Sequence, residues 1–127
     1  MATKQQIWEY VHSNLTVHSS DANSITLLFD TDWGRSQFVS VFCADASPFV
    51  TVVSRIGPSD RVDANRLLQL STADNKVMGI RQFGDSYFVS HVAFLDELTS
   101  QGLTVAMQWV LEEADSYEQQ LGLGDKN

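Results

Sequence analysis

Two runs of β-branched and aromatic residues flank Gly84-Asp85, and this pattern constrains the fold more than any other stretch of the chain. A two-residue Gly-Asp loop between such runs is typical of a tight antiparallel hairpin. The turn also fixes the register, because Ser86 must lie opposite Phe83 and each further pair follows in step. The sequence therefore predicts a hairpin whose strands present two defined sets of side chains, one to each face.

Both faces of this predicted hairpin are apolar. One face carries Val77, Phe83, Phe88, Val92 and Phe94 together with Gly79, Arg81 and Ser90. The other face carries Met78, Ile80, Tyr87, Val89 and His91. A hairpin with one solvent-exposed face alternates between apolar and polar residues, and this one does not. We therefore expect the chain's own helices to cover one side and a partner to cover the other. The sequence leaves open which side the helices cover, and we predict the second set to be a partner or dimer surface.

Apolar residues at helical spacing predict two helices in the first part of the chain. The first spans residues 3–18, where apolar residues recur every four positions from Ile7 to Leu15. The second follows a Gly-Pro pair, and Ser59 or Asp60 is placed to accept hydrogen bonds from its first backbone N–H groups. We expect both helices to pack on the sheet.

A third helix is predicted near the end of the chain, with Thr99 or Ser100 as its N-cap. Its apolar stripe keeps an alternating spacing of four and three residues through Leu103, Met107, Val110, Ala114, Tyr117 and Leu121. Gly122 is suited to ending the helix, because glycine readily adopts the left-handed conformation of a C-cap. We expect this stripe to be the only buried face of the helix.

Three strands are predicted between the first two helices. They lie near residues 25–29, 37–43 and 49–56, and turn-forming residues separate them. The last two share an aliphatic face of Val39, Val41, Cys43, Val50, Val52 and Ile56. The expected fold is therefore α+β, with an antiparallel sheet, the order α-β-β-β-α-β-β-α and the helices mainly on one face. We expect a single domain over residues 1–122, followed by a short flexible tail at 123–127.

The net charge of −8 is concentrated near the C-terminal end of the chain. Residues 82–125 contain eight acidic residues and no basic one. We expect Glu112, Glu113 and Asp115 to point outward from the last helix, so that this part of the chain forms an acidic surface. Such a surface repels phosphate, which argues against nucleic acid and anionic membrane as partners.

The sequence contains little that supports catalysis or metal binding. It has three histidines and one cysteine, and the spacings typical of zinc sites, nucleophile elbows and phosphate-binding loops are absent. We therefore predict no catalytic residue, no metal and no cofactor. Cys43 lies among apolar residues, where we expect it to be buried and inert. One cysteine and no long apolar segment favour a cytoplasmic protein.

Three segments of the chain together resemble a known family. The leucine-rich segment Ala64-Asn65-Arg66-Leu67-Leu68-Gln69-Leu70, the glycine-turned hairpin and the helical Ala114-Asp115-Ser116-Tyr117 resemble the YbjN family of bacterial sensory transduction regulators. The family usually has an asparagine after the leucine-rich helix, where this chain has Ser71. That family resembles the type III secretion chaperones in fold. The resemblance implies a homodimer that holds proteins or peptides, and it transfers no catalytic residue.

Three functions are compatible with these observations. The first is a non-enzymatic, chaperone-like homodimer that binds a protein or peptide client, which accounts for the surplus apolar surface of the hairpin. The second is a regulatory adaptor in bacterial sensory transduction, whose partner would be a folded signalling protein. The third is a small ligand-binding domain or enzyme. A pull-down from lysate distinguishes the first function from the second. A client of a chaperone would be unfolded and secreted, whereas the partner of an adaptor would be folded and cytosolic.

Overall fold

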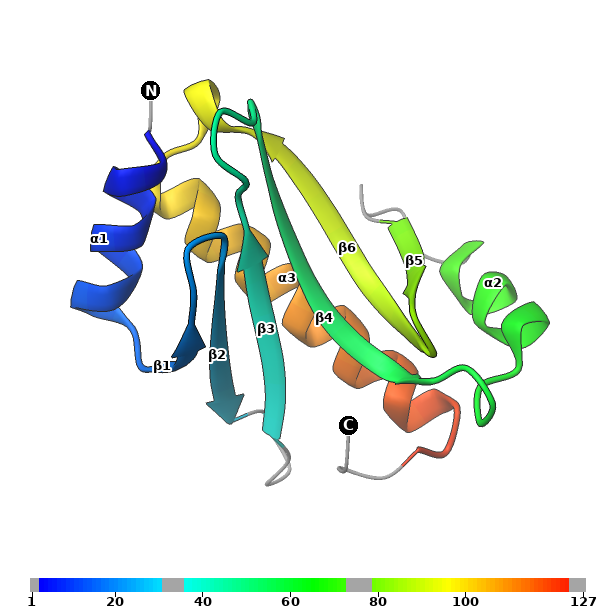
Figure 1. The fold of residues 1–127 in the computed structure, drawn as a ribbon. Coiled ribbons are helices and arrows are strands. Elements are labelled where there is room, and N and C mark those ends of the chain that lie inside the picture. The colour runs from blue at the N-terminus through cyan, green and yellow to red at the C-terminus, as the bar shows by residue number, and fades with distance from the viewer. Residues whose placement is uncertain (1–2, 31–35, 73–78, 124–127) are drawn as a thin grey trace.

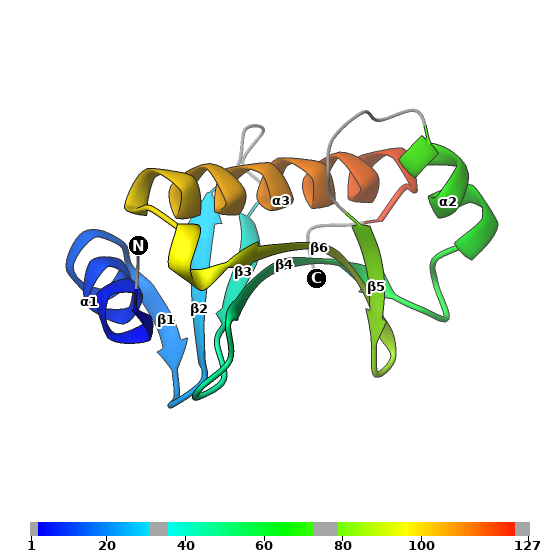
Figure 2. The same cartoon turned by 90° about the horizontal axis from the view of Figure 1, so that it is seen from above.

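A six-stranded antiparallel sheet forms the centre of the computed structural model, which describes residues 3–30, 36–72 and 79–123. The strand order is β1-β2-β3-β4-β6-β5, and α3 runs along one face of the sheet (Figures 1 and 2). The elements are α1 (Lys4–Asn14), β1 (Val17–Ser20), β2 (Ser24–Asp30), β3 (Ser36–Phe42), β4 (Phe49–Pro58), α2 (Ala64–Thr72), β5 (Gly79–Phe83), β6 (Ser86–Phe94), the 3-10 turn η2 (Leu95–Glu97) and α3 (Ser100–Gln120). The predicted α+β class with an antiparallel sheet is confirmed.

The first helix is shorter than its apolar spacing predicts, because α1 ends at Asn14 and not at residue 18. Leu15 has an extended backbone, with φ −130° and ψ 156°, and Val17 pairs with Leu27 of β2. Thr16 and Val17 are β-branched residues, which favour strands over helices. The chain therefore gains the short strand β1 at one edge of the sheet.

The middle strands pair as the sequence predicts, with Val41 opposite Val52. All of the predicted aliphatic face is buried in the core: Val39, Val41, Cys43, Val50, Val52 and Ile56. Burial raises the pKa of the Cys43 thiol, which keeps the less reactive protonated form. This supports the prediction that the cysteine is buried and structural.

The second helix begins later than predicted, at Ala64. The Asp63 carboxylate accepts hydrogen bonds from the backbone N–H groups of Asn65 and Arg66, at 3.0 and 3.3 Å, so Asp63 is the capping residue. The predicted caps Ser59 and Asp60 precede it in a turn, where the Arg61 N–H donates to the Pro58 carbonyl.

The third helix confirms most of its predicted features. Thr99 is the N-cap, since its hydroxyl accepts a hydrogen bond from the Gly102 N–H at 2.9 Å. Five of the six stripe residues are buried, and Leu121 is half-buried: Leu103, Met107, Val110, Ala114, Tyr117 and Leu121. The helix ends where Gly122 adopts a φ of 72°.

The buried arc of α3 is nevertheless wider than the stripe, so the prediction of a single buried face is wrong. Glu113, Asp115 and Glu118 are at most 8% exposed, and only Glu112 of the three acids expected to point outward does so. The Arg66 guanidinium donates to the Gln120 carbonyl, and α2 lies beside this end of α3 (Figure 2). A helix packed against both a sheet and a second helix buries more than one stripe, and part of the expected acidic surface is therefore interior.

The chain remains packed just beyond α3. Leu123, which the sequence assigns to a flexible tail, is 8% exposed and belongs to the core cluster. Its N–H donates to the Glu118 carbonyl at 2.8 Å, as expected after a left-handed glycine at a helix end. The rest of the predicted tail lies outside the described residues.

Candidate functional site

The hairpin formed by β5 and β6 has the predicted register, with Ile80 opposite Val89 and Phe83 opposite Ser86. One of its faces packs against α3. Val89 is 1% exposed within the core cluster, and Ile80 and Tyr87 are half-buried against that cluster.

The residues predicted as a partner or dimer surface therefore lie on the face that the chain's own helix covers. His91 is half-buried there, opposite Val52 of β4. Met78, the remaining member of the predicted set, lies outside the described residues. Whether any of this set contacts a partner stays a prediction, but the surplus apolar surface is on the other side.

The opposite side of the sheet, which we name the open face, points away from α3, and no helix within the described ranges covers it (Figure 2). Strand pairing assigns to it Leu28, Phe38, Ser40, Phe42, Phe49, Thr51, Val53, Arg55, Gly79, Arg81, Phe83, Phe88, Ser90, Val92 and Phe94. Six of the chain's seven phenylalanines are among them. Several of its apolar residues are 40–58% exposed: Leu28, Phe42, Phe49, Phe83, Val92 and Phe94. An apolar surface of this kind typically marks an interaction site.

Two aromatic pairs on the open face hold its side chains in place. The rings of Phe49 and Phe94 have centroids 5.3 Å apart, and those of Phe83 and Phe88 are 5.4 Å apart in an edge arrangement. Such contacts are worth about 0.5–1.5 kcal/mol beyond simple burial. Between the two pairs lies a pocket of about 460 Å³, lined by Ser40, Phe42, Thr51, Val53, Arg81, Phe83 and Phe88.

The charges on the open face are few. Arg55 donates from Nε to the Ser86 hydroxyl at 2.9 Å and is half-buried. Arg81 is exposed, and its guanidinium carbon lies 4.9 Å from the centre of the Phe83 ring. This stacking orients a cation at the rim of the pocket.

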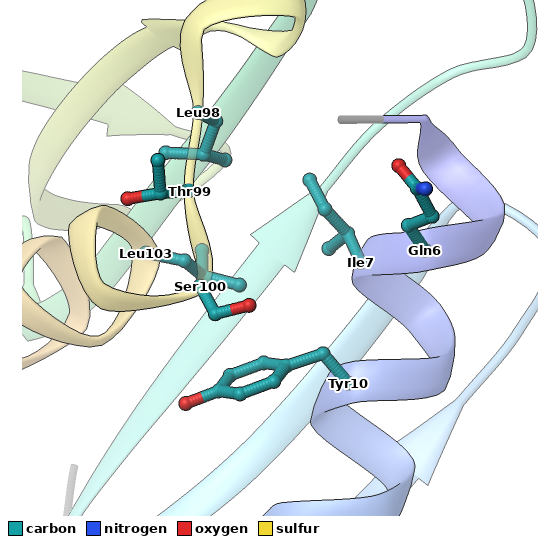
Figure 3. Close-up of a pocket in the computed structure, with 7 residues that line it drawn as sticks. All are labelled: Gln6, Ile7, Tyr10, Leu98, Thr99, Ser100 and Leu103. Carbon is teal, nitrogen blue, oxygen red and sulfur yellow. The ribbon is translucent and has the colours of Figure 1, made fainter. Parts of the chain in front are cut away.

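A second pocket, of about 400 Å³, lies between α1 and the start of α3 (Figure 3). Its polar groups already have structural roles. The Tyr10 hydroxyl hydrogen-bonds Thr104 at 2.9 Å, the Thr99 hydroxyl caps α3, and the Gln6 side chain accepts from the Thr3 N–H. We therefore interpret this pocket as a packing defect between two helices.

The described residues do not assemble a recognisable catalytic centre. His12, His18 and His91 lie on three different elements, and no group of three metal-ligating side chains comes together within the described ranges. Among the helices that the structure describes, none is long and apolar enough to cross a membrane. What the open face offers is shape and apolar contact for a partner.

No family model matches the sequence, and no curated protein matches it. Two solved structures share the architecture. A chain of the ExsC–ExsE complex aligns with a TM-score of 0.70 and 13% identity, over 95% of this chain and 97% of that one. A chain of the HopA1–SchA chaperone–effector complex aligns with a TM-score of 0.68 and 15% identity, over 91% of this chain and 92% of that one. This chain therefore shares its fold with a chain of each of these two complexes.

Strand pairing shows which open-face residues the sequence pattern left unidentified. Leu28, Phe38, Phe42 and Phe49 were not among the predicted partner residues, although the strand pattern of β3 and β4 does separate Phe38 and Phe42 from the core residues. Their alternation with buried valines is the signal that could have found them. This alternation becomes informative once β4 is known to pair with β6. That pairing joins the aromatic residues of β3 and β4 to those of β5 and β6 in one continuous surface.

Proposed function

We propose that this chain is a non-enzymatic, chaperone-like protein that binds a protein or peptide client on the open face. The observation that carries the proposal is the set of exposed phenylalanines, with Leu28 and Val92, that no described helix covers. Burying such side chains against a partner is favourable by about 25 cal/mol per Å² of apolar surface. The fold likeness supports the same role, since one of the similar structures is a chaperone–effector complex.

The client-binding proposal is tested by photo-cross-linking in the native host, with p-benzoylphenylalanine in place of Phe94. Phe94 is 58% exposed on the open face, so the photoreactive group should give an adduct with a different protein. The matched control is the same group in place of Trp109, which is 42% exposed on α3. Equal adduct yields at both positions, or no adduct at Phe94, would contradict the proposal.

We further propose that the chain is a homodimer, that it acts in the bacterial cytoplasm and that it is related to the YbjN family. Support for a dimer comes from the sheet edge at β5, which α2 adjoins (Figures 1 and 2). Leu68 of α2 is 56% exposed, and Ile80 of β5 is half-buried near the same edge. An edge strand beside a helix with an exposed leucine is suited to pairing with a second copy of itself.

Sedimentation equilibrium at micromolar concentration should give about twice the 14.2 kDa mass of the chain. Leu68→Glu should shift the distribution to the monomer. In a two-fold interface the two introduced carboxylates would lie close to each other in an apolar contact and repel. Trp109→Gln, an exposed apolar residue on another helix, should leave the dimer intact. A wild-type chain that sediments as a monomer would disprove the dimer and leave client binding unaffected.

A further inference from the structure

The pocket on the open face lies over Ser40 and Val53, and these two residues begin a row of short side chains that continues across the sheet as the floor of a trough. Ser40 pairs with Val53, Val53 with Ser90, and Ser90 with Gly79, so this row crosses four neighbouring strands. A Cβ atom built on Gly79 would meet nothing within 4 Å. With neighbouring strands about 4.8 Å apart, the row is about 14 Å long, which matches about four residues of extended chain.

The rows on both sides of this floor include larger side chains. Phe42, Thr51 and Val92 form the row on one side. Arg55, Phe88 and Arg81 form the row on the other. Since the trough runs across the strands, an occupant would be held by side-chain contacts and not by pairing with a strand edge. Ser90 is 5% exposed, and its hydroxyl oxygen is enclosed without a hydrogen-bond partner, so this part of the floor offers no polar contact at its surface.

Arg81 gives the trough a chemical preference. Its guanidinium forms no ion pair with any residue in the described ranges, and it lies over the Phe83 ring. The acid among the strand residues on the open face is Asp30 of β2, four strands away from β5. Asp85, in the turn between β5 and β6, accepts a hydrogen bond from the Ser86 hydroxyl at 3.4 Å. A stacked guanidinium keeps its N–H edge free to bind a carboxylate with two hydrogen bonds. The acidic excess of the whole chain acts weakly here, because charges more than about 8 Å apart are largely screened at physiological salt.

The shape of the sheet argues against a second copy of the chain as the occupant. Figure 2 shows the sheet as an arch with α3 along its outer side, so the open face is the hollow one. Two hollow faces touch mainly at their rims and leave the pocket between them unfilled. A narrow, extended segment can instead reach the floor of the trough.

We propose that this trough binds an extended peptide segment in which large apolar side chains flank an aspartate or glutamate, with Arg81 pairing with the carboxylate. The inference rests on the proposed client binding and names the chemistry of the bound segment. The apolar side chains lie between Phe42 and Phe88, and the acidic residue lies at the β5 end of the trough.

The test uses two fluorescent, end-capped synthetic peptides that differ in one residue, a Leu-Glu-Leu core and its uncharged Leu-Gln-Leu counterpart. Fluorescence polarisation with the full chain should show about tenfold tighter binding of the glutamate peptide, as expected for one charge-assisted contact. Arg81→Met keeps an apolar stem and should abolish the preference, while Arg81→Lys should keep part of it. Arg61→Met removes an exposed arginine outside the open face and should leave the preference unchanged.

Gly79→Leu places a large side chain at the β5 end of the row, where a Cβ atom has no neighbour within 4 Å. It should weaken both peptides about tenfold with no decrease in Tm. Equal affinity of the wild-type chain for the two peptides would overturn the carboxylate preference, while weakening of both by Gly79→Leu would still support client binding. If neither peptide binds and Gly79→Leu dissociates a dimer, the occupant is a second copy and the peptide proposal fails.

Discussion

Val110→Asp should lower the free energy of unfolding by at least ~3 kcal/mol. Val110 is fully buried at the centre of α3, within the core cluster that the helix shares with the sheet. A carboxylate there must either remain charged without water or bind a proton at neutral pH, and both are costly. Because small domains are stable by only about 5–15 kcal/mol, urea unfolding followed by circular dichroism should show a clear decrease in the midpoint.

Glu112→Ala is the matched control on the same helix. Glu112 is exposed and accepts a hydrogen bond from the Gln108 amide at 3.1 Å, a surface contact worth less than ~0.5 kcal/mol. The sequence pattern alone would make Glu113 an equally good control, yet Glu113 is 8% exposed. Similar losses for Val110→Asp and Glu112→Ala would mean that the helix is rotated from the orientation described.

Local patterns were sufficient wherever one strong signal decided the structure. The Gly84-Asp85 turn fixed the pairing of β5 with β6, and the alternation of valines fixed that of β3 with β4. The spacing from Leu103 to Leu121 identified α3 and its main buried stripe. In each case the information lies within one hairpin or one helix, so no distant contact is needed to read it.

Features that depend on distant parts of the chain were not predicted. The buried positions of Glu113, Asp115 and Glu118 follow from the packing of α2 and the final turn near the end of α3. The early end of α1 follows from the pairing of Val17 with β2, which overrides the helical spacing of the residues before it. Sequence periodicity identifies the most apolar face of a helix or strand. It does not predict the additional faces that become buried when distant elements pack against it.

The candidate site shows the same division. The sequence indicates that both hairpin faces are apolar, and this is why it predicts a partner at all. The sequence does not indicate which face α3 covers. Val89 and Val92 are equally apolar and differ only in that their side chains point to opposite faces of β6. The choice depends on the path of the chain from β6 through η2 into α3, and the structure resolves it in favour of the Val89 side.

Val89→Asp and Val92→Asp should therefore have opposite consequences, although both place the same charge on β6. Val89 is 1% exposed beneath α3, and its substitution should cost at least ~3 kcal/mol of unfolding free energy. Val92 is 48% exposed on the open face, where water can solvate a carboxylate, so its substitution should cost less than ~1 kcal/mol. Val92→Asp should instead reduce the cross-linked adduct formed from residue 94, because the two positions share one apolar contact surface. If Val92→Asp unfolds the chain and Val89→Asp does not, α3 covers the Val92 side of the hairpin and the client must bind on the Val89 side.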